Sequence, residues 1–235
     1  MIAIIRSIAF ETTRFTLTVI FSLVAVFTTP LKPISRYQVI TIWSRLITRL
    51  SKTICGIDYR VVGIENLPHE PCVILSNHQS SWETFAFQVI FPPQVWVLKK
   101  SLLRIPFFGW GLAMMNPIAI DRSSGTEALR QMLHQGKDRI INGWYVIVFP
   151  EGTRMKPTEK AKYQPGGAWL ARKLEVPILP VAHNAGALWA KNALVKKPGI
   201  ITVTVGEPIQ TKDRSVNSLI DEASSWIELN KYNEG

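Results

Sequence analysis

Cysteine is scarce in this sequence: Cys55 and Cys72 are the two cysteines among 235 residues. The pair forms neither a metal-ligand spacing nor a disulfide framework, which excludes the small disulfide-stapled class and fits a reducing compartment. No H-E-x-x-H segment, no cluster of cysteine and histidine, and no G-x-S-x-G elbow occurs in the chain. The sequence therefore predicts no metal site, and it gives no argument for an acyl-serine intermediate. Internal repeats and low-complexity segments are absent as well.

Acidic residues are also few, with 17 Asp and Glu against 27 Lys and Arg, which gives a formal net charge of +10. A basic chain is expected to meet an anionic partner: nucleic acid, anionic lipid or a phosphorylated substrate. The eight tryptophans favour lipid, because Trp is common at membrane interfaces as well as in cores. No nucleic-acid-binding motif occurs, and the excess charge lies beside apolar segments, so we expect no nucleic-acid partner.

The N-terminal region carries an uncharged, mostly apolar run at residues 15–29, bounded by Arg14 and by Pro30 and Lys32. As a helix this run measures about 22 Å. It is shorter than the helix of roughly 20 residues that a simple membrane span needs. We therefore expect a shallow, re-entrant or tilted anchor. A signal peptide is the alternative, although Glu11 and Arg14 sit late for one and no clear small-x-small cleavage site follows.

The segment 37–54 has the pattern of an amphipathic helix. Its apolar positions fall within about 120° of a helical wheel, and Arg45, Arg49 and Lys52 fall on the opposite side. A basic amphipathic helix of this kind is typical of an anionic membrane interface, and the alternative is an ordinary surface helix that covers the core. With the preceding run, it predicts a two-helix membrane-associating module at residues 1–56.

The remaining chain, residues 57–235, alternates between strand and helix patterns. Strands are predicted at residues 59–62, 72–75, 95–98, 117–120, 144–149, 178–183 and 200–205. Helices are predicted at residues 82–91, 102–115, 125–142, 167–174 and 213–229, the third of them beginning with a capping box of Ser124 and Glu127. This alternation predicts a single α/β domain with a mostly parallel or mixed sheet flanked by helices.

The stretch Ser76-Asn77-His78-Gln79-Ser80-Ser81-Trp82-Glu83 lies between a predicted strand and a predicted helix. If Ser80 or Ser81 caps the helix, Glu83 falls in its first turn and its carboxylate can reach an imidazole nitrogen of His78. A carboxylate on one ring nitrogen fixes the tautomer and leaves the other nitrogen to take a proton, which would make His78 a general base. The alternative is structural, because Ser80 to Glu83 is itself a capping box and Asn77-His78 can form a turn.

Three further segments carry candidate binding residues after predicted strands, where α/β sheets usually bind ligands. Glu151-Gly152-Thr153-Arg154 combines a permissive backbone, a hydroxyl and a planar guanidinium suited to phosphate, although a turn with a local salt bridge has the same composition. Lys99, Lys100 and Arg104 offer either phosphate ligands or a solvated basic edge. Pro177 and Pro180 flank an apolar strand, and packing is their simplest role. His69, His134 and His183 have no clear partners in the sequence and are expected to be structural or surface residues.

These four segments, in this order and spacing, resemble the four blocks of the glycerolipid acyltransferase family. The resemblance covers roughly residues 62–208 and is strongest to bacterial 1-acyl-sn-glycerol-3-phosphate acyltransferases. One position departs from the family pattern, since the family usually has Asp where this chain has Glu83. Glu is one methylene longer, so the hydrogen bond remains possible but its fine geometry differs.

The resemblance implies transfer of a fatty acyl group from an acyl thioester to the free hydroxyl of 1-acyl-sn-glycerol-3-phosphate, which gives phosphatidic acid. It implies that His78 and Glu83 are catalytic and that the following residues bind substrate: Asn77, Lys99, Lys100, Arg104, Glu151, Gly152, Thr153, Arg154 and, near the acyl chain, Pro180. It implies no resident cofactor, with acyl-coenzyme A or acyl carrier protein as co-substrate. The partners are membrane lipids and lysophosphatidic acid, and we expect the protein at the cytoplasmic face of a bacterial inner membrane. Another lysolipid or glycerol 3-phosphate could be the acceptor instead, and a non-catalytic peripheral membrane protein is the alternative from a different class.

Overall fold

The computed structural model describes residues 1–159 and 162–232. These residues contain a seven-stranded sheet in the order β1-β7-β6-β2-β5-β3-β4. Neighbouring strands are parallel except for β6 and β7, which are antiparallel. The predicted mixed α/β sheet is therefore confirmed, and so are all seven predicted strands. They span Ile57–Val62 (β1), Val73–Ser76 (β2), Gln94–Lys99 (β3), Ile118–Ile120 (β4), Tyr145–Val148 (β5), Ile178–His183 (β6) and Gly199–Val205 (β7).

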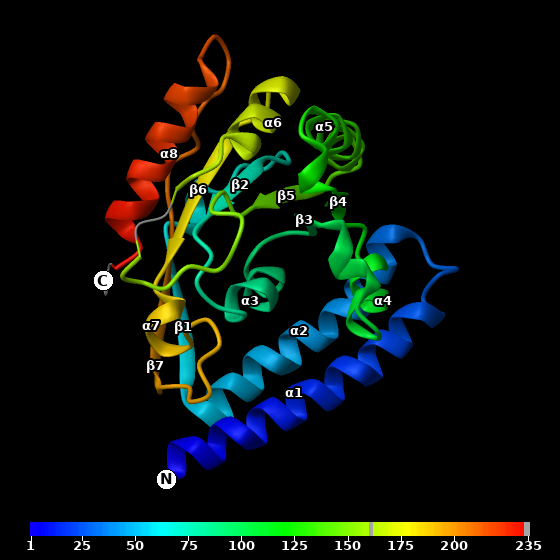
Figure 1. Ribbon diagram of the computed structural model, residues 1–235, viewed down its shortest axis with the longest axis vertical. Coiled ribbons are helices and arrows are strands. Elements are labelled where there is room, and N and C mark those ends of the chain that lie inside the picture. The colour runs from blue at the N-terminus through cyan, green and yellow to red at the C-terminus, as the bar shows by residue number, and fades with distance from the viewer. Residues whose placement is uncertain (160–161, 233–235) are drawn as a thin grey trace.

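Helices cover both faces of the sheet (Figure 1). One face is covered by α3 (Trp82–Ile90), over which lie α2 (Pro33–Cys55) and then α1 (Ile2–Phe27). The other face is covered by α5 (Thr126–Ile141), α6 (Gly166–Leu174) and α8 (Val216–Asn230), while the short α7 (Ala185–Leu188) follows β6. Because both faces are covered, the central strands β2, β5 and β6 are buried along their whole length, as their nearly continuous apolar sequences predict.

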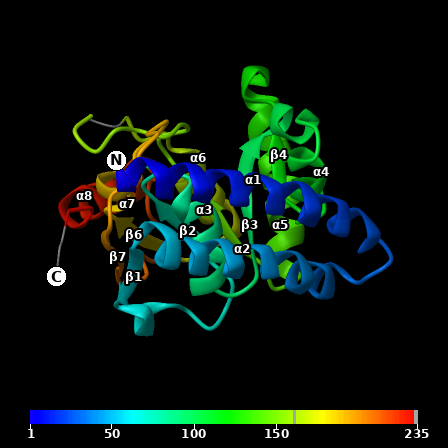
Figure 2. The ribbon, with the colours of Figure 1, turned by 90° about the horizontal axis from the view of Figure 1, so that it is seen from below.

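Helix α2 shows how the amphipathic segment is used. Its apolar side faces α1 and α3, with Ile40 and Ile47 buried, whereas Arg45, Arg49 and Lys52 are exposed. The apolar stripe of α2 is thus covered by protein, which agrees with the alternative of a surface helix that covers the core. Figure 2 shows α1 and α2 running side by side across the molecule.

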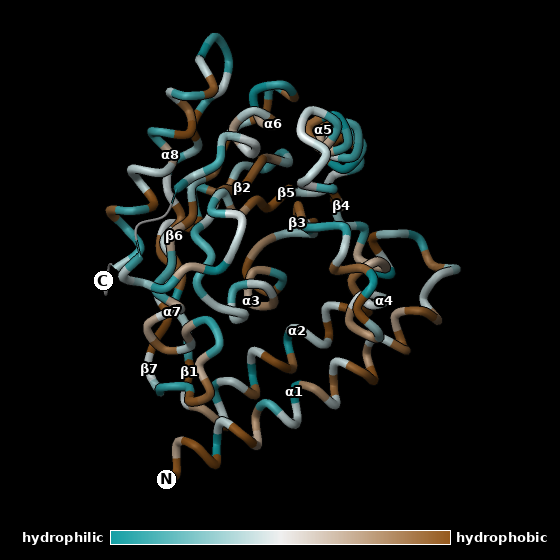
Figure 3. Tube along the Cα trace, in the orientation of Figure 1, coloured by the Kyte–Doolittle hydropathy of each residue, from teal (hydrophilic) through white to brown (hydrophobic). Residues whose placement is uncertain are grey.

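Helix α1 is longer than the predicted run, because it begins at Ile2 and has 26 residues. Arg14, which bounded the run on its N-terminal side, lies within the helix and pairs with Glu11, which also pairs with Lys196. Among the described residues, α1 is the one helix that is long and apolar enough to cross a membrane, judged by length and composition, so the length of the helix does not favour a shallow anchor over a span. Apolar residues occur along most of α1 (Figure 3), and large ones are exposed at Ile5, Ile8, Phe15, Ile20 and Phe27.

The helix predicted at residues 102–115 is wrong. The chain forms a 3₁₀ helix at Lys100–Arg104 (η2), breaks at residues 105–107, and continues as a short helix at Phe108–Ala113 (α4). Pro106 explains the break, because proline disfavours helical backbone in the residue before it, and Ile105 is extended.

The predicted capping box of α5 is also wrong. Ser124 belongs to a separate 3₁₀ turn at Arg122–Ser124 (η3), where its hydroxyl donates to the carbonyl of Asp121. Gly125 is the N-cap of α5 and provides no side-chain cap. The last helix, α8, begins at Val216 rather than at residue 213, because Ser215 is its N-cap and accepts a hydrogen bond from the amide of Ser218.

Candidate active site

The candidate site lies at the carboxyl end of β2, a strand at the centre of the sheet between β5 and β6. The chain leaves β2 at Ser76, turns through His78, and enters α3 at Trp82. The carboxyl ends of β5 and β6 meet this turn, because both strands are parallel to β2. Segments that are distant in sequence therefore converge here, as is usual for ligand sites of α/β sheets.

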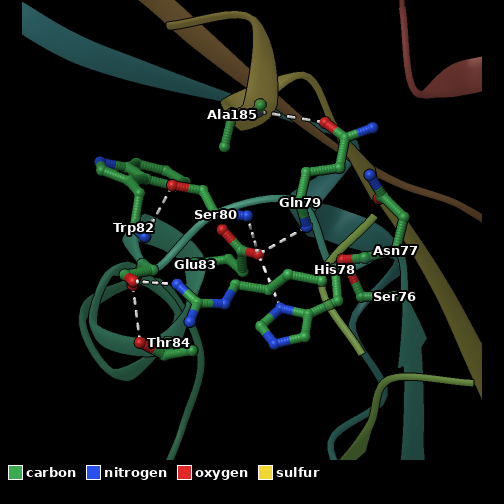
Figure 4. A network of polar contacts seen from close by, with 12 residues as sticks. Ser76, Asn77, His78, Gln79, Ser80, Trp82, Glu83, Thr84 and Ala185 are labelled. Carbon is green, nitrogen blue, oxygen red and sulfur yellow. Dashed lines mark hydrogen bonds and ion pairs between the residues drawn. The ribbon is translucent and has the colours of Figure 1, made fainter. Parts of the chain in front are cut away.

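His78 and Glu83 are in direct contact. Oε1 of Glu83 lies 2.8 Å from Nδ1 of His78 and also accepts the backbone amides of Gln79, at 2.9 Å, and Ser80, at 2.7 Å (Figure 4). Glu83 thus does both things that the sequence allowed: it satisfies backbone donors at a helix start and it holds the imidazole. The predicted serine cap takes another form, because Ser81 is the N-cap but its hydroxyl makes no capping hydrogen bond, and Ser80 Oγ accepts the amide of Trp82 at 3.1 Å.

The protonation of this pair follows from its surroundings. The Glu83 side chain is 0% exposed. Burial alone would raise its pKa, yet the neighbouring imidazoles of His183 and His78 and the amide of Ser80 together hold the pKa of Glu83 below its usual value. An ionised carboxylate can only accept, so Nδ1 of His78 carries the proton that is shared with Glu83. The Nε2 atom of His78 is left with a lone pair that can take a proton.

The loop after β5 fixes the backbone of His78. The carboxylate of Glu151 accepts the His78 amide at 2.6 Å, and the amide of Met155 donates to the His78 carbonyl at 2.8 Å. Phe149, the last residue before this loop, stacks on the imidazole with ring centroids 4.1 Å apart and an interplanar angle of 10°. The ring and backbone of His78 are therefore held from several sides before any substrate binds.

Glu151 differs from Glu83 in its expected charge. Burial raises the pKa of Glu151 to about 8, with the nearby charge of Glu83 adding to this effect and the His78 amide opposing it. Near neutral pH the Glu151 carboxyl is then mostly protonated. In that form it can still accept the His78 amide and does not repel an anion nearby.

A cavity of about 400 Å³ opens beside His78. Its walls come from both sides of the site: from the loops after β2 and β5, from β3, and from the helices α1, α2, α3 and α4. Most of its lining is apolar or uncharged, namely Thr18, Phe21, Ser22, Trp43, Thr84, Gln88, Trp96, Val97, Leu98, Leu102, Phe108, Gly111, Leu112, Met115 and Phe149. The volume is within the usual range for small-molecule sites.

The predicted binding residues separate into two groups. Lys99, Gly152, Thr153 and Arg154 line the cavity with His78. Arg154 is held beside it by a hydrogen bond from Nη1 to the hydroxyl of Ser81 at 2.8 Å. The glycine at 152 has a positive φ of 72°, a conformation that favours glycine.

The other predicted residues do not line the cavity, although Glu151 accepts the amide of His78 beside it. Lys100 and Arg104 are exposed on η2 and are not among the described residues that line it. Asn77 is buried with its amide group bonded to the backbone of His183, and Pro180 is buried in β6, where its carbonyl accepts the amide of Gly206.

Sequence reasoning missed two residues of the site. His183 was expected to be structural or exposed without a clear partner, yet it is fully buried and its Nε2 atom lies 3.9 Å from Glu83. Phe149 was taken only as part of a strand. The available signal was position, since each of them ends or follows an apolar strand parallel to β2. His69 and His134 are exposed, as expected. Within residues 1–159 and 162–232, no group of three or more His, Cys, Asp or Glu could hold a metal ion.

The geometry can be compared with known proteins. The Acyltransferase family matches residues 58–184, more than half of the chain, including both the His78 turn and the loop after β5. The protein belongs to the acyltransferase family. The resemblance drawn from the sequence motifs is thereby confirmed.

Relatives of this acyltransferase cover most of its length. It is 43% identical over 206 residues to the 1-acyl-sn-glycerol-3-phosphate acyltransferase of Pseudomonas aeruginosa, covering 86% of this chain and 80% of the relative. It is 34% identical over 177 residues to the enzyme of the same name from Saccharomyces cerevisiae, covering 73% of this chain and 58% of the relative. The crystal structure of the 1-acyl-sn-glycerophosphate acyltransferase from Thermotoga maritima has the same fold, with a TM-score of 0.79 at 23% identity, over 97% of this chain and 93% of that one.

Proposed function

We propose that this acyltransferase moves a fatty acyl group from an acyl thioester to the free hydroxyl of 1-acyl-sn-glycerol-3-phosphate, producing phosphatidic acid. The relatives that bear the name of this activity support the acceptor. The observation that carries the proposal is the contact of His78 with Glu83 beside a cavity lined by both apolar residues and the cations Lys99 and Arg154. A base, an anion-binding group and space for an acyl chain thus meet in one place.

In the proposed reaction, the Nε2 atom of His78 takes the proton of the acceptor hydroxyl while Glu83 stabilises the imidazolium. The acceptor oxygen attacks the thioester carbonyl, and backbone amides stabilise the resulting oxyanion. The intermediate then expels the thiolate, which takes the proton from His78, so that the ester and the free thiol are the products. Because the acyl group passes directly between substrates, the reaction needs neither a covalent enzyme intermediate nor a resident cofactor.

The acceptor phosphate is proposed to bind Arg154 and Lys99, with Gly152 and Thr153 beside it. Arg154 suits this role because its guanidinium forms paired hydrogen bonds with phosphate oxygens. A mostly protonated Glu151 would tolerate the phosphate and could donate a hydrogen bond to it. The apolar part of the cavity, formed with α1, α2 and α4, is proposed to hold a fatty acyl chain.

Membrane association through α1 is part of the proposal, with the active site at the cytoplasmic face of a bacterial inner membrane. It is supported by the length and apolar composition of α1 and by its exposed apolar side chains. Replacing Ile8 and Phe15 by Glu should release the protein from liposomes in a flotation assay. The control replaces Ile141 and Leu229, which lie on α5 and α8 and are even more exposed, by Glu, and that variant should float like the parent.

The test is acyl transfer by purified protein in mixed micelles that contain lysophosphatidic acid and a labelled acyl thioester. His78→Ala should lower kcat by about 10² to 10⁴. Acyl-coenzyme A and acyl carrier protein are supplied in separate assays to identify the donor, and other lysolipids and glycerol 3-phosphate compete for the acceptor site. Near-normal turnover by His78→Ala would contradict the mechanism. A parent that binds lysophosphatidic acid but transfers no acyl group from either donor to any acceptor would contradict the activity.

A further inference from the structure

His183 lies at the end of β6 and is fully buried beside the catalytic turn. Its Nδ1 atom is 3.2 Å from the backbone amide of Ala185, and its Nε2 atom is 2.8 Å from the carbonyl oxygen of Asn77. The amide of Ala185 can only donate, so Nδ1 must be an acceptor and the proton must lie on Nε2. Burial also lowers the pKa of His183, which keeps the ring neutral. The ring therefore donates from Nε2 to the Asn77 carbonyl.

The carbonyl of Asn77 and the amide of His78 belong to one planar peptide group. His183 holds the carbonyl end of this group at 2.8 Å, and Glu151 holds the amide end at 2.6 Å. Hydrogen bonds at both its carbonyl and its amide restrain this peptide group from rotating about the flanking bonds. The direction in which the side chain of His78 leaves the backbone is fixed as a result.

Two more hydrogen bonds join the same residues. The side-chain oxygen of Asn77 accepts the backbone amide of His183 at 3.0 Å, and its side-chain nitrogen donates to the His183 carbonyl at 2.9 Å. Asn77 is drawn with the catalytic turn in Figure 4. These bonds align the ends of β2 and β6 without using the backbone carbonyl of Asn77, which lies 2.8 Å from Nε2 of His183 and accepts a longer bond, of 3.3 Å, from the Ser76 hydroxyl. Holding the peptide plane is thus a separate contribution of the His183 ring.

We propose that His183 is a positioning residue that orients His78 by holding the Asn77–His78 peptide through its Nε2–H group. It does not reach the substrate cavity, since it is not among the described residues that line it. Its effect on turnover rests on the proposed function, because it acts through His78. Its effect on the geometry of His78 does not depend on that function.

Two substitutions of His183 distinguish the contribution of its Nε2 atom from that of its Nδ1 atom. The side-chain amide of Gln can occupy the place of Nε2 and donate to Asn77, whereas Asn reaches only the place of Nδ1. His183→Asn should lower kcat by about 10²-fold with both KM values unchanged, because a small misplacement of a catalytic group has this effect. His183→Gln should stay within about threefold of the parent on the same basis. Thermal unfolding of each variant gives the folded fraction by which kcat is corrected. Equal losses in the two variants, or a normal kcat in His183→Asn, would overturn the proposal.

Imidazole nitrogen NMR of the ¹⁵N-histidine-labelled protein in detergent tests the geometry without any assay. The parent should show His183 as the neutral Nε2–H tautomer near neutral pH. The resonances of His78 should move in His183→Asn and stay near the parent positions in His183→Gln. A charged His183, or its Nδ1–H tautomer, in the parent would refute the inference even if no variant folds. If the parent transfers no acyl group, the proposed function fails while these spectra still decide on His183.

Discussion

The Oε1 atom of Glu83 lies 2.8 Å from Nδ1 of His78 while it accepts the amides of Gln79 and Ser80. The same oxygen therefore accepts backbone amides at the start of helix α3 and holds the imidazole of His78. The glutamate, where the family usually has aspartate, reaches this position from the first turn of the helix. Its longer side chain is compatible with the contact.

Removing the charge of Glu83 should separate its two roles. Glu83→Gln keeps an oxygen for the backbone amides but loses the negative charge that stabilises the His78 imidazolium in the proposed mechanism, so we expect kcat to fall by about 10²-fold or more. Glu83→Asp keeps the charge with a shorter reach and should lose less. Steady-state kinetics with lysophosphatidic acid as acceptor measures both variants. A Gln variant as active as the parent would show that the charge has no catalytic role.

Lys99 and Lys100 are both exposed neighbours in the sequence, but Lys99 lines the cavity and Lys100 does not. Lys99→Gln should raise the KM for lysophosphatidic acid by about tenfold, or about 1.4 kcal/mol, through the loss of one charge-assisted contact with phosphate. Lys100→Gln is the matched control and should change this KM by less than about twofold, as for an exposed charge. The opposite order would place the phosphate outside the cavity.

The strands could be predicted because their cause is local. Val73-Ile74-Leu75 is an apolar run that is completely buried, because helices cover both faces of the sheet. Such a run is visible in the sequence. Pro106 is an equally local indication that the helix predicted at residues 102–115 is interrupted. The apolar residues around it favoured the prediction of one continuous helix. Helix α1 continues through Glu11 and Arg14, and one of the two partners of Glu11, Lys196, is distant in the sequence.

The site was predictable to the extent that its residues are neighbours in the chain. His78 and Glu83 are five positions apart, and their contact could be derived from a strand, a turn and a helix start. The contacts of His183 with Asn77 and of Phe149 with His78 bridge different strands. They depend on the order of strands in the sheet, which no local pattern states. The separation of Lys99 from Lys100 likewise depends on where the cavity lies.

The pH dependence of stability should identify Glu151. Its pKa is raised by burial to about 8 in the folded protein, against about 4.3 in an unfolded chain. The folded state therefore binds more protons between these values, so the contribution of Glu151 to the free energy of unfolding is fully present below the unfolded value and is lost as the pH rises toward 8. Glu151→Gln removes this loss. Its stability relative to the parent should increase as the pH rises from about 5 to 8.

Thermal unfolding of parent and variant across this pH range measures the difference. Glu159→Gln is the control, because Glu159 lies exposed in the same loop, and its difference from the parent should not grow with pH. A Glu151 difference that is flat in pH would show that this carboxyl is ionised throughout.

The cavity should set which acyl chains are accepted. Thr18 on α1 lines the cavity, whereas Thr16, two residues away, is exposed and does not line it. Thr18→Phe fills part of the space and should lower kcat/KM for the longest acyl thioesters relative to shorter ones by roughly tenfold. Thr16→Phe places the same side chain outside and should leave the preference unchanged. Competition between acyl thioesters of different length measures the ratio, and an equal effect of the two variants would argue that the acyl chain binds elsewhere.

Helix α1 is joined to the loop before β7 by a buried charge. The Lys196 side chain is 2% exposed, pairs with Glu11, and lies 5.0 Å from the ring centre of Trp189. Glu11→Ala would leave the buried ammonium without its carboxylate, which should lower the free energy of unfolding by roughly 3 kcal/mol. Arg14→Ala removes the other, more exposed partner of Glu11 and should cost less than about 1 kcal/mol. Denaturant unfolding in detergent compares the two variants. Equal stability of the two variants would show that the Glu11–Lys196 pair does not hold α1 in place. The charges of Glu11 and Arg14 would then only reflect the exposure of this part of the helix to water.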